Sequence, residues 1–316
     1  MYRPRHSGIG VLPSKVLFPR RPVHSRRCGA GAQWTMVSDS KTTTRMLCVL
    51  ISLPPRYFHR APRRPDPNAP GLPVTVSGGY RGGTRKGLDM TIGGPAVIQS
   101  PNTSVTVRGG ALLRTVRRRT DNKVISGPSL LVDEVLRLSG APTIDHLVKT
   151  TWSGDISALS PPTPPRGTFM YLHRVTRDPS AGERPTVYRS PRIGLDLSNP
   201  DTTDSSTHPR VVFVGKPYRY FTHPALLTKG RVQSFIGLHA MLRESKGYAE
   251  DSMELKKALR DILRLGEQNV SKYMTDYRSG YQVGKLKSFV GRSGKGVCQS
   301  ASEYLKMMGA VRKALQ

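Results

Sequence analysis

Short runs of apolar residues, separated by glycine, proline and asparagine, begin at about residue 72. Runs of this length that are rich in valine, isoleucine and leucine and bounded by turn residues are typical of β-strands. They predict strands at 73–76, 88–93, 96–98, 104–108 and 111–117. Similar runs later in the chain predict strands at 168–175, 192–197 and 211–214.

A helical period first appears after a Ser-Gly-Pro sequence in the middle of the chain. Leu131, Val135 and Leu138 recur at a spacing that places them on one face of a helix. Gly140 follows at the position where a C-cap glycine ends many helices. The pattern predicts a helix over 129–138, and the fold class is therefore mixed α+β.

After Arg231 the helical period continues towards the C-terminus, with lysine and arginine opposite the apolar positions. Asp251 and Glu254 have the spacing of a capping box, which predicts a helix start there. Three tyrosines that repeat every four residues favour the core packing of a helical hairpin over the stacking of nucleic-acid bases: Tyr273, Tyr277 and Tyr281. We therefore expect a basic helical extension over 236–316.

Residues 1–70 follow neither period and are rich in arginine, proline and serine, a composition that predicts disorder. The absence of acidic residues before Asp39 is typical of a mitochondrial transit peptide, although prolines interrupt the expected amphipathic helix. The predicted organisation is a disordered basic segment (1–70), a mixed α/β domain (71–235) and the helical extension.

The chain carries 50 lysine and arginine residues against 21 aspartate and glutamate residues, a formal net charge of +29. Without residues 1–70, 37 basic residues still face 19 acidic ones. This excess predicts a polyanionic partner, because lysine and arginine replace the counterions of nucleic-acid phosphates. DNA fits this expectation, and an RNA-binding or ribosome-associated protein is the alternative.

The sequence disfavours several other classes of protein. Three widely separated cysteines predict neither a disulfide framework nor a cysteine-based zinc site, and no metal or organic cofactor is expected. The longest apolar run, 46–53, is too short to span a bilayer, so no membrane partner is expected. The segment 291–296 resembles a phosphate loop but lacks the Walker spacing, so nucleotide hydrolysis is not predicted.

Four short motifs together resemble the alkyladenine (3-methyladenine) DNA glycosylase family. Residues 88–93 are similar to a strand that ends in Met-Asn-Ile, and 110–117 resemble a strand of the type Val-Leu-Leu-Arg-Ala. Residues 125–131 resemble the family's Ser/Thr-Gly-Pro helix start. Residues 190–196, followed after an insertion by 215–221, resemble its closing Pro-Arg-Ile-Gly and Pro-Trp-Arg-Phe strands.

The resemblance covers about half of the chain, residues 75–232, and implies a curved β-sheet with helices that lays a positive face on the DNA backbone. It implies that one damaged nucleotide is flipped into a pocket, where the N-glycosidic bond of an alkylated or deaminated purine is hydrolysed. The partner is then double-stranded DNA containing damaged purines. The protein would act as a monomer in base-excision repair, in the nucleus or in the mitochondrion.

The sequence departs from the family at the catalytic glutamate. The family's Glu-Ala-Tyr motif lies upstream of these strands, whereas the first glutamate here is Glu134, inside the predicted helix. The tyrosine and histidine residues that sandwich the flipped base also lack clear counterparts. Three explanations remain open: a divergent glycosylase, a glycosylase-fold protein that binds nucleic acid without cutting, or a gene model in which noncoding sequence replaces the first exon.

A divergent glycosylase needs another carboxylate, and Asp89 is the only acidic residue between Asp66 and Asp121. Its alternative role is a salt bridge to Lys86 or Arg85. Thr91 stands at the position of the family's base-sensing asparagine. Arg114 matches the family's arginine that holds the water and the catalytic carboxylate, so Asp89 and Arg114 are the candidate catalytic residues.

The candidate DNA contacts are basic side chains and backbone positions close to the motifs. Their structural alternatives are a solvated turn, a helix cap and sheet packing. The candidates are Arg81, Arg85, Lys86, Ser126, Gly127, Arg192, Lys216 and Arg219.

Overall fold

The structure of the protein is a computed structural model, which describes nine segments of the chain within the compact unit Gly31–Gln316. These segments are 32–37, 43–52, 86–92, 98–100, 103–105, 109–118, 120–153, 169–174 and 185–316. The strand predicted at 73–76 lies outside them, as do Arg81 and Arg85.

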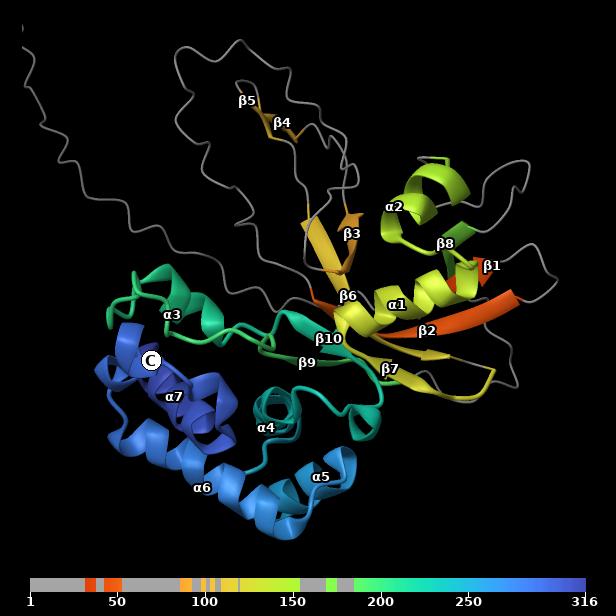
Figure 1. Cartoon of the computed structure of the whole chain (residues 1–316). Coiled ribbons are helices and arrows are strands. Elements are labelled where there is room, and N and C mark those ends of the chain that lie inside the picture. Colours follow the sequence, from red (N-terminus) through yellow and green to blue (C-terminus); the bar gives the residue numbers. More distant parts are fainter. Residues whose placement is uncertain are drawn as a thin grey trace, which may run out of the picture. The chain divides into compact units, whose positions relative to one another are not determined.

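Two ten-residue strands, β2 (Thr43–Ser52) and β6 (Gly109–Arg118), pair antiparallel at the centre of an eight-stranded sheet (Figure 1). The outer edge of β6 pairs with β3 (Leu88–Ile92) and then with β7 (Val124–Ser126). The outer edge of β2 pairs with β1 (Ala32–Val37) and with β10 (Arg219–Phe221). On the far side of these strands, β8 (Phe169–Arg174) pairs with β1, and β9 (Tyr188–Ser190) pairs with β10.

Most of the predicted strands are confirmed. The strands expected at 88–93, 111–117 and 168–175 appear as β3, β6 and β8. Two short strands form a separate two-stranded sheet close to the positions predicted for them: β4 (Ile98–Ser100) and β5 (Thr103–Val105).

The prediction of disorder over 1–70 is wrong for β1 and β2. The apolar run at 46–53 is too short for a membrane span, yet it is long enough for the end of β2, a strand that is paired on both edges. The arginine and proline content of the surrounding seventy residues hid this local pattern. The rest of 1–70 lies outside the described residues.

Two of the predicted strands are wrong. Residues 192–197 form turns, and the strand of that region is β9, which ends at Ser190. Residues 211–214 belong to helix α3 (Pro209–Val214). Pro209 occupies the first helical position and the ring of His208 accepts a hydrogen bond from the Arg210 N–H at 3.1 Å, so the chain starts a helix where a four-residue apolar run alone is ambiguous.

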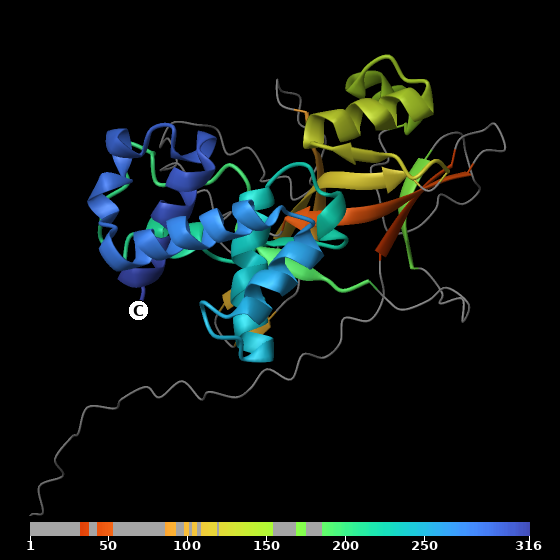
Figure 2. The same cartoon turned by 90° about the horizontal axis from the view of Figure 1, so that it is seen from below.

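Helix α1 (Pro128–Ser139) confirms the predicted central helix and packs against β6 and β7 (Figure 2). Leu131 and Val135 are buried with Leu113 and Val116 of β6. Gly140 ends the helix in the left-handed conformation, as predicted, with φ of 64°. A helical turn, α2 (Ile144–His146), and a π-helical turn, η1 (Leu147–Thr151), follow.

Four long helices form the C-terminal part, as predicted, but they are not an appended extension. They are α4 (Arg231–Lys246), α5 (Met253–Leu263), α6 (Glu267–Val283) and α7 (Ala301–Ala314). Their buried faces share one core with Leu197 and with Phe221 of β10. The expected boundary at 235 falls inside α4, because the sequence could not show that this helix packs on the sheet.

Helix α4 approaches β9 so closely that only a glycine fits at the contact. A Cβ atom at Gly237 would lie 2.0 Å from the carbonyl oxygen of Arg189 and 2.7 Å from Cα of Ser190. The start of α5 also differs from its prediction. The N-cap is Ser252, whose hydroxyl accepts from the Leu255 N–H at 3.1 Å, while Asp251 pairs with Arg278.

Helices α6 and α7 are in similarly close contact. A Cβ at Gly280 would lie 2.0 Å from the carbonyl oxygen of Lys306, and one at Gly309 would lie 2.2 Å from that of Tyr277. Tyr277 is buried in the core, which confirms the packing role expected for it over base stacking. Both helices require glycine at this contact. An added methyl group would collide with backbone atoms, which cannot move aside as a flexible side chain can.

We expect Gly309→Ala to lower the free energy of unfolding by about 3 kcal/mol, because overpacking against a backbone cannot be relieved by a rotamer change. The matched control is Gly215→Ala, since a Cβ there would meet only the flexible end of Met308 at 3.4 Å. The control should change the free energy by less than about 1 kcal/mol. Urea unfolding of both variants measures the difference, and equal losses would contradict the close-contact interpretation.

His239 of α4 provides a second test of this core. Its ring is 3% exposed and lies against Phe235 and Tyr277, and burial lowers its pKa from 6.5 to about 4. Because the unfolded chain takes up a proton on this ring below pH 6.5 and the folded chain does not, stability falls as the pH drops towards 4.

We expect the His239 contribution to this loss to be about 2 to 3 kcal/mol between pH 7 and pH 4.5. His239→Gln should therefore show a smaller loss over the same interval than the unsubstituted protein. Urea unfolding at the two pH values measures both losses. An identical pH dependence in the two proteins would mean that His239 titrates normally.

Candidate functional site

The sheet brings the motif segments together at one end of β2 and β6. At this end the strand order is β3, β6, β2, β10 and β9, so that strands distant in sequence become neighbours. The register pairs Asp89 with Leu112 and Thr91 with Gly110. The partner of Asp89, Leu112, therefore lies two residues before Arg114 on β6.

Arg114 lies at an irregularity in the pairing of β6 with β2. Thr115 pairs with Leu50 and Leu113 pairs with Ile51, so the register skips Arg114 on β6 as well as Val49 on β2. The Arg114 carbonyl oxygen accepts a hydrogen bond from the Gly127 N–H at 2.7 Å, which ties this irregularity to the start of α1. Interrupted pairing, as at β-bulges, lets a side chain depart from the regular alternation of a strand.

Three arginines influence one another at this end of the sheet. Burial lowers the pKa of Arg114, and the charge of Arg192 lowers it further. Burial likewise lowers the pKa of Arg219 to about 9, with a smaller effect from Arg114. Within the described residues no carboxylate forms an ion pair with Arg114 or Arg219. A group of cations arranged in this way favours an anionic ligand close to Arg114.

Arg219 itself is not a DNA contact, and that prediction is wrong. The side chain is 1% exposed, and its guanidinium donates to the hydroxyls of Ser190 at 3.0 Å and Ser234 at 2.9 Å. It also donates to the carbonyl oxygens of Gly230 at 3.2 Å and Lys229 at 3.3 Å. Arg219 therefore fastens β10 to β9 and to the start of α4, and cannot reach a phosphate.

Lys86 pairs with Asp133 of α1 at 2.8 Å, a partner that the sequence did not suggest. The side chain of Asp89 lies outside the described part of the structure, so its pairing with Lys86 stays a prediction. Both side chains are 46% exposed, so the pair contributes little to stability and leaves the ammonium open to solvent. Lys216 is exposed just after α3, and Arg192 is partly buried just after β9. The phosphate contacts expected of these three residues stay predictions.

Ser126 and Gly127 lie at the predicted helix start, but the cap differs from the expected one. The N-cap of α1 is Gly127, with φ of 133° and no side-chain cap. Ser126 ends β7, and its hydroxyl lies 3.4 Å from that of Thr115. The serine therefore links two strands of the sheet, and its phosphate contact stays a prediction.

Glu134, the first glutamate of the chain, is held in a charge network that the sequence analysis missed. It is 9% exposed, pairs with Arg118 and accepts from Arg137 at 2.7 and 3.0 Å. The hydrogen bonds from Arg137 lower the pKa of Glu134, against the effect of its burial. Both carboxylate oxygens of Glu134 accept hydrogen bonds from arginines. Glu134 is therefore not free to act as the catalytic glutamate that the resemblance implies. The three-residue spacing of Glu134 and Arg137 was a usable signal.

Arg117 and His223 are a second missed pair. Burial and the nearby charge of Arg117 lower the pKa of His223, which adopts a left-handed backbone with φ of 49° after β10. More than a hundred residues separate the two, so no sequence spacing could have linked them. Arg117 adds a cation to the region around β6 and β10, whereas its charge favours the neutral form of His223.

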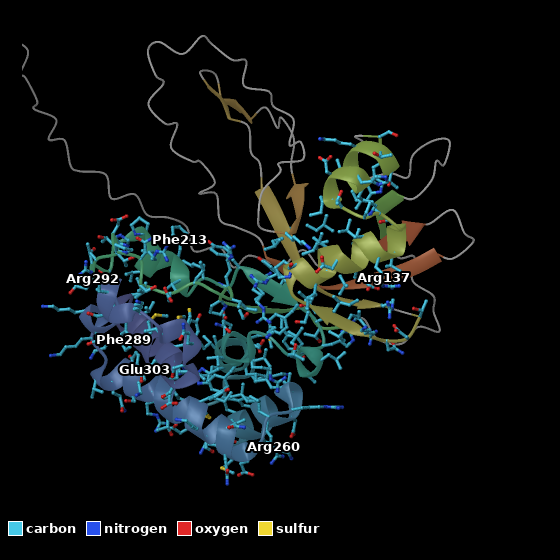
Figure 3. The ribbon with its side chains drawn as sticks, viewed as in Figure 1. Arg137, Phe213, Arg260, Phe289, Arg292 and Glu303 are labelled. Atoms are coloured by element: carbon cyan, nitrogen blue, oxygen red, sulfur yellow. The ribbon has the colours of Figure 1, made fainter. Side chains whose placement is uncertain are left out.

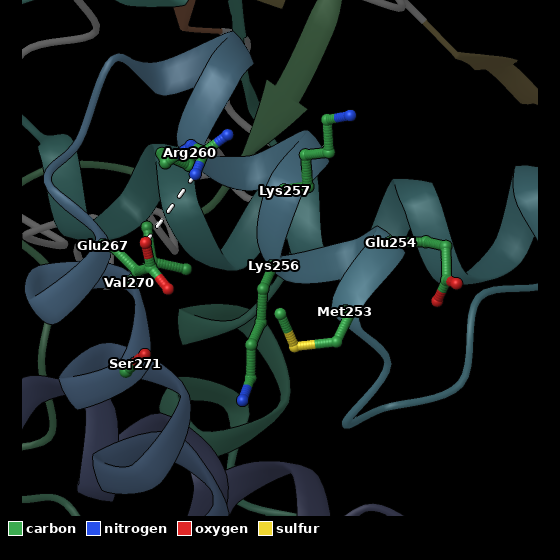
Figure 4. A pocket seen from close by; sticks show the side chains of 8 residues that line it. All are labelled: Met253, Glu254, Lys256, Lys257, Arg260, Glu267, Val270 and Ser271. Carbon is green, nitrogen blue, oxygen red and sulfur yellow. Dashed lines mark ion pairs between the residues drawn. The ribbon is translucent and has the colours of Figure 1, made fainter.

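A cavity of ≈ 340 Å³ lies between α5 and α6 (Figure 4), and none of the predicted site residues lines it. Arg260 crosses towards Glu267 at 3.7 Å, and Met253 and Val270 supply apolar lining. Its charges of both signs offset each other, so the cavity does not favour a polyanion as the Arg114 region does.

Within the described segments no group of three or more histidine, cysteine, aspartate or glutamate residues could hold a metal ion. None of the helices in those segments is long and apolar enough to cross a membrane.

Comparisons with known proteins identify no family, because no family model, curated protein or solved structure matches the chain. The relationship to alkyladenine DNA glycosylases is therefore an inference from the motifs in the sequence.

Arg219 and Lys216 allow the structural and DNA-binding roles to be separated. Arg219→Met leaves two backbone acceptors without a buried donor, so we expect it to cost about 2 kcal/mol of unfolding free energy while the folded variant keeps its DNA affinity. Lys216→Gln should do the reverse, because the side chain is exposed. Urea unfolding and fluorescence anisotropy with duplex DNA measure the two effects. A weaker affinity in folded Arg219→Met would restore it as a DNA contact.

Proposed function

We propose that this protein binds double-stranded DNA, flips a damaged purine out of the duplex and hydrolyses its N-glycosidic bond. Asp89 acts as the general base and Arg114 as the residue that holds the carboxylate and the attacking water. Thr91 lines the base pocket, and Arg192 and Lys216 contact backbone phosphates.

The observation that carries this proposal is the position of Asp89 relative to Arg114. The two residues lie on different strands, and the register brings Asp89 opposite Leu112, two residues from Arg114 at the irregularity of β6. A partly buried arginine without a described carboxylate partner favours an anionic neighbour. Asp89 is the only acidic residue in the sequences of β3 and β6.

The proposed reaction needs a carboxylate, a water molecule and a glycosidic bond that the damage to the base has weakened. The water oxygen attacks C1′ of the deoxyribose while Asp89 takes up the water proton. The bond between C1′ and the purine nitrogen breaks, and its electron pair leaves with the purine. An alkylated purine that carries a positive charge thereby becomes neutral, so it needs no further proton. Hypoxanthine and ethenoadenine carry no such charge, so each takes up one proton from solvent water as it leaves. A nearby arginine keeps Asp89 ionised and able to accept the proton.

The positive region around Arg114 supports the binding step. Flipping one nucleotide costs a few kcal/mol, least for a damaged base, and phosphate contacts on either side supply this energy. The formal charge of +29 supports a strong, salt-dependent affinity for duplex DNA.

A second candidate function is binding without cleavage. It is favoured by the network around Glu134, because this glutamate, which follows the motif at 125–131, is engaged by Arg118 and Arg137. On this alternative Asp89 would be a structural partner of Arg114, and the protein would recognise a lesion without removing the base.

The two candidates differ in one measurement, the appearance of abasic sites in duplexes that contain 3-methyladenine, ethenoadenine or hypoxanthine. We expect cleavage by the unsubstituted protein and a loss of about a hundredfold or more in Asp89→Asn, because general-base catalysis contributes rates of this order. Asp204→Asn, at an exposed carboxylate, is the control and should cleave normally.

Cleavage that survives in Asp89→Asn would exclude Asp89 as the base. No cleavage by the unsubstituted protein, together with tighter binding of the lesion duplexes than of undamaged duplex, would establish binding without chemistry. Tighter binding of structured RNA than of any duplex would contradict both candidates.

A further inference from the structure

The connection between α6 and α7 is a well-anchored basic segment, which we call the basic strap and define as residues 284–300. It contains three 3₁₀ turns: η3 (Leu286–Ser288), η4 (Gly291–Gly294) and η5 (Val297–Gln299). Figure 3 shows Phe289 and Arg292 of the strap on the same side of the helical part as Glu303 of α7.

The strap is held to the protein by its apolar residues and its backbone. Leu286, Phe289 and Val297 are buried in the core shared by the four helices. The Gly291 N–H donates to the carbonyl oxygen of Leu197 at 2.9 Å, and a Cβ at Gly294 would lie 3.2 Å from Cα of Ser198. A segment fixed in this way loses little conformational entropy when it binds a partner.

The charged side chains of the strap are all cationic. No carboxylate occurs in the sequence between Asp276 and Glu303. Four cations of this stretch are exposed, and none of them forms an ion pair within the described residues: Lys285, Lys287, Arg292 and Lys295.

The neighbouring carboxylates are engaged elsewhere. Asp276 pairs with Lys272 at 3.1 Å, and Glu303 pairs with Lys306 at 2.9 Å. Asp196, next to the attachment point at Leu197, accepts from the Ser198 hydroxyl at 2.6 Å and from the Cys298 thiol of the strap, so it stays a charged carboxylate beside the strap. One such carboxylate does not offset the four exposed cations, and the strap presents a net positive charge.

Gly296 leaves the backbone of the strap open at one point. It has φ of 86°, and a Cβ there would meet no atom within 4 Å. A phosphate that binds the lysine side chains can thus also approach the backbone at Gly296 closely.

We propose that the basic strap is a second DNA contact, which binds phosphates of the duplex backbone outside the site around Arg114. It adds affinity that does not depend on the base sequence, because its cations bind backbone phosphates. The inference rests on the nucleic-acid binding in the proposed function but not on its chemistry. Undamaged duplex therefore tests it, and a failure at Asp89 leaves it intact.

The experiment compares two triple variants of the full chain that lose the same charge. The strap variant is Lys285→Gln, Lys287→Gln and Lys295→Gln, and the control variant is Lys246→Gln, Lys256→Gln and Lys257→Gln on α4 and α5. Fluorescence anisotropy with an undamaged 20-base-pair duplex is recorded between 50 and 200 mM NaCl, and urea unfolding checks that both variants are folded.

We expect the strap variant to bind at least about tenfold more weakly at 100 mM salt and its salt slope to fall by about 2.7, since each phosphate contact contributes about 0.9. The control should keep most of the affinity and of the slope. Equal losses in the two variants would show a general field effect and overturn the proposal. An unchanged strap variant would overturn it as well, and so would a strap effect seen only with structured RNA.

Discussion

The pairing of β2 with β6 is the constraint on which the rest of the sheet depends. Each strand is ten residues long, and each uses one edge for the other and the second edge for two short strands. Because both strands are paired on both edges, a change in their register would move every other strand. The irregularity that leaves Arg114 of β6 without a register partner lies inside this central ladder, so the position of the candidate site is fixed by the sheet itself.

A buried guanidinium connects this sheet to the helical part. Arg219 binds two serine hydroxyls and two carbonyl oxygens that belong to β9, to the chain before α4 and to α4. Its burial is costly, which its lowered pKa reflects, and the hydrogen bonds offset that cost. The same arrangement explains why the four helices are part of the fold. If α4 moved away from β9, the Arg219 guanidinium would lose its hydrogen bonds to Ser234 and to the chain before α4.

The charges of the protein divide into those that the fold uses and those that it leaves outward. Arg118 and Arg137 neutralise Glu134, and similar pairs bind the helices to one another. The cations of the basic strap and the exposed Lys216 have no such partner in the described residues. If the proposed function holds, these unneutralised charges bind phosphates at two places, and lesion recognition is confined to the site beside Arg114.

The sequence by itself determined the elements whose local pattern has one interpretation. The helix over 129–138, its glycine cap, the strand that carries Arg114 and the helical C-terminal part all follow from short-range periodicity. Only the tertiary structure decided that β2 is central, that 211–214 are helical and that Arg219 is buried. These depend on which distant segments supply the pairing strand, the packing surface or the hydrogen-bond acceptors, and a local pattern holds no information about such partners.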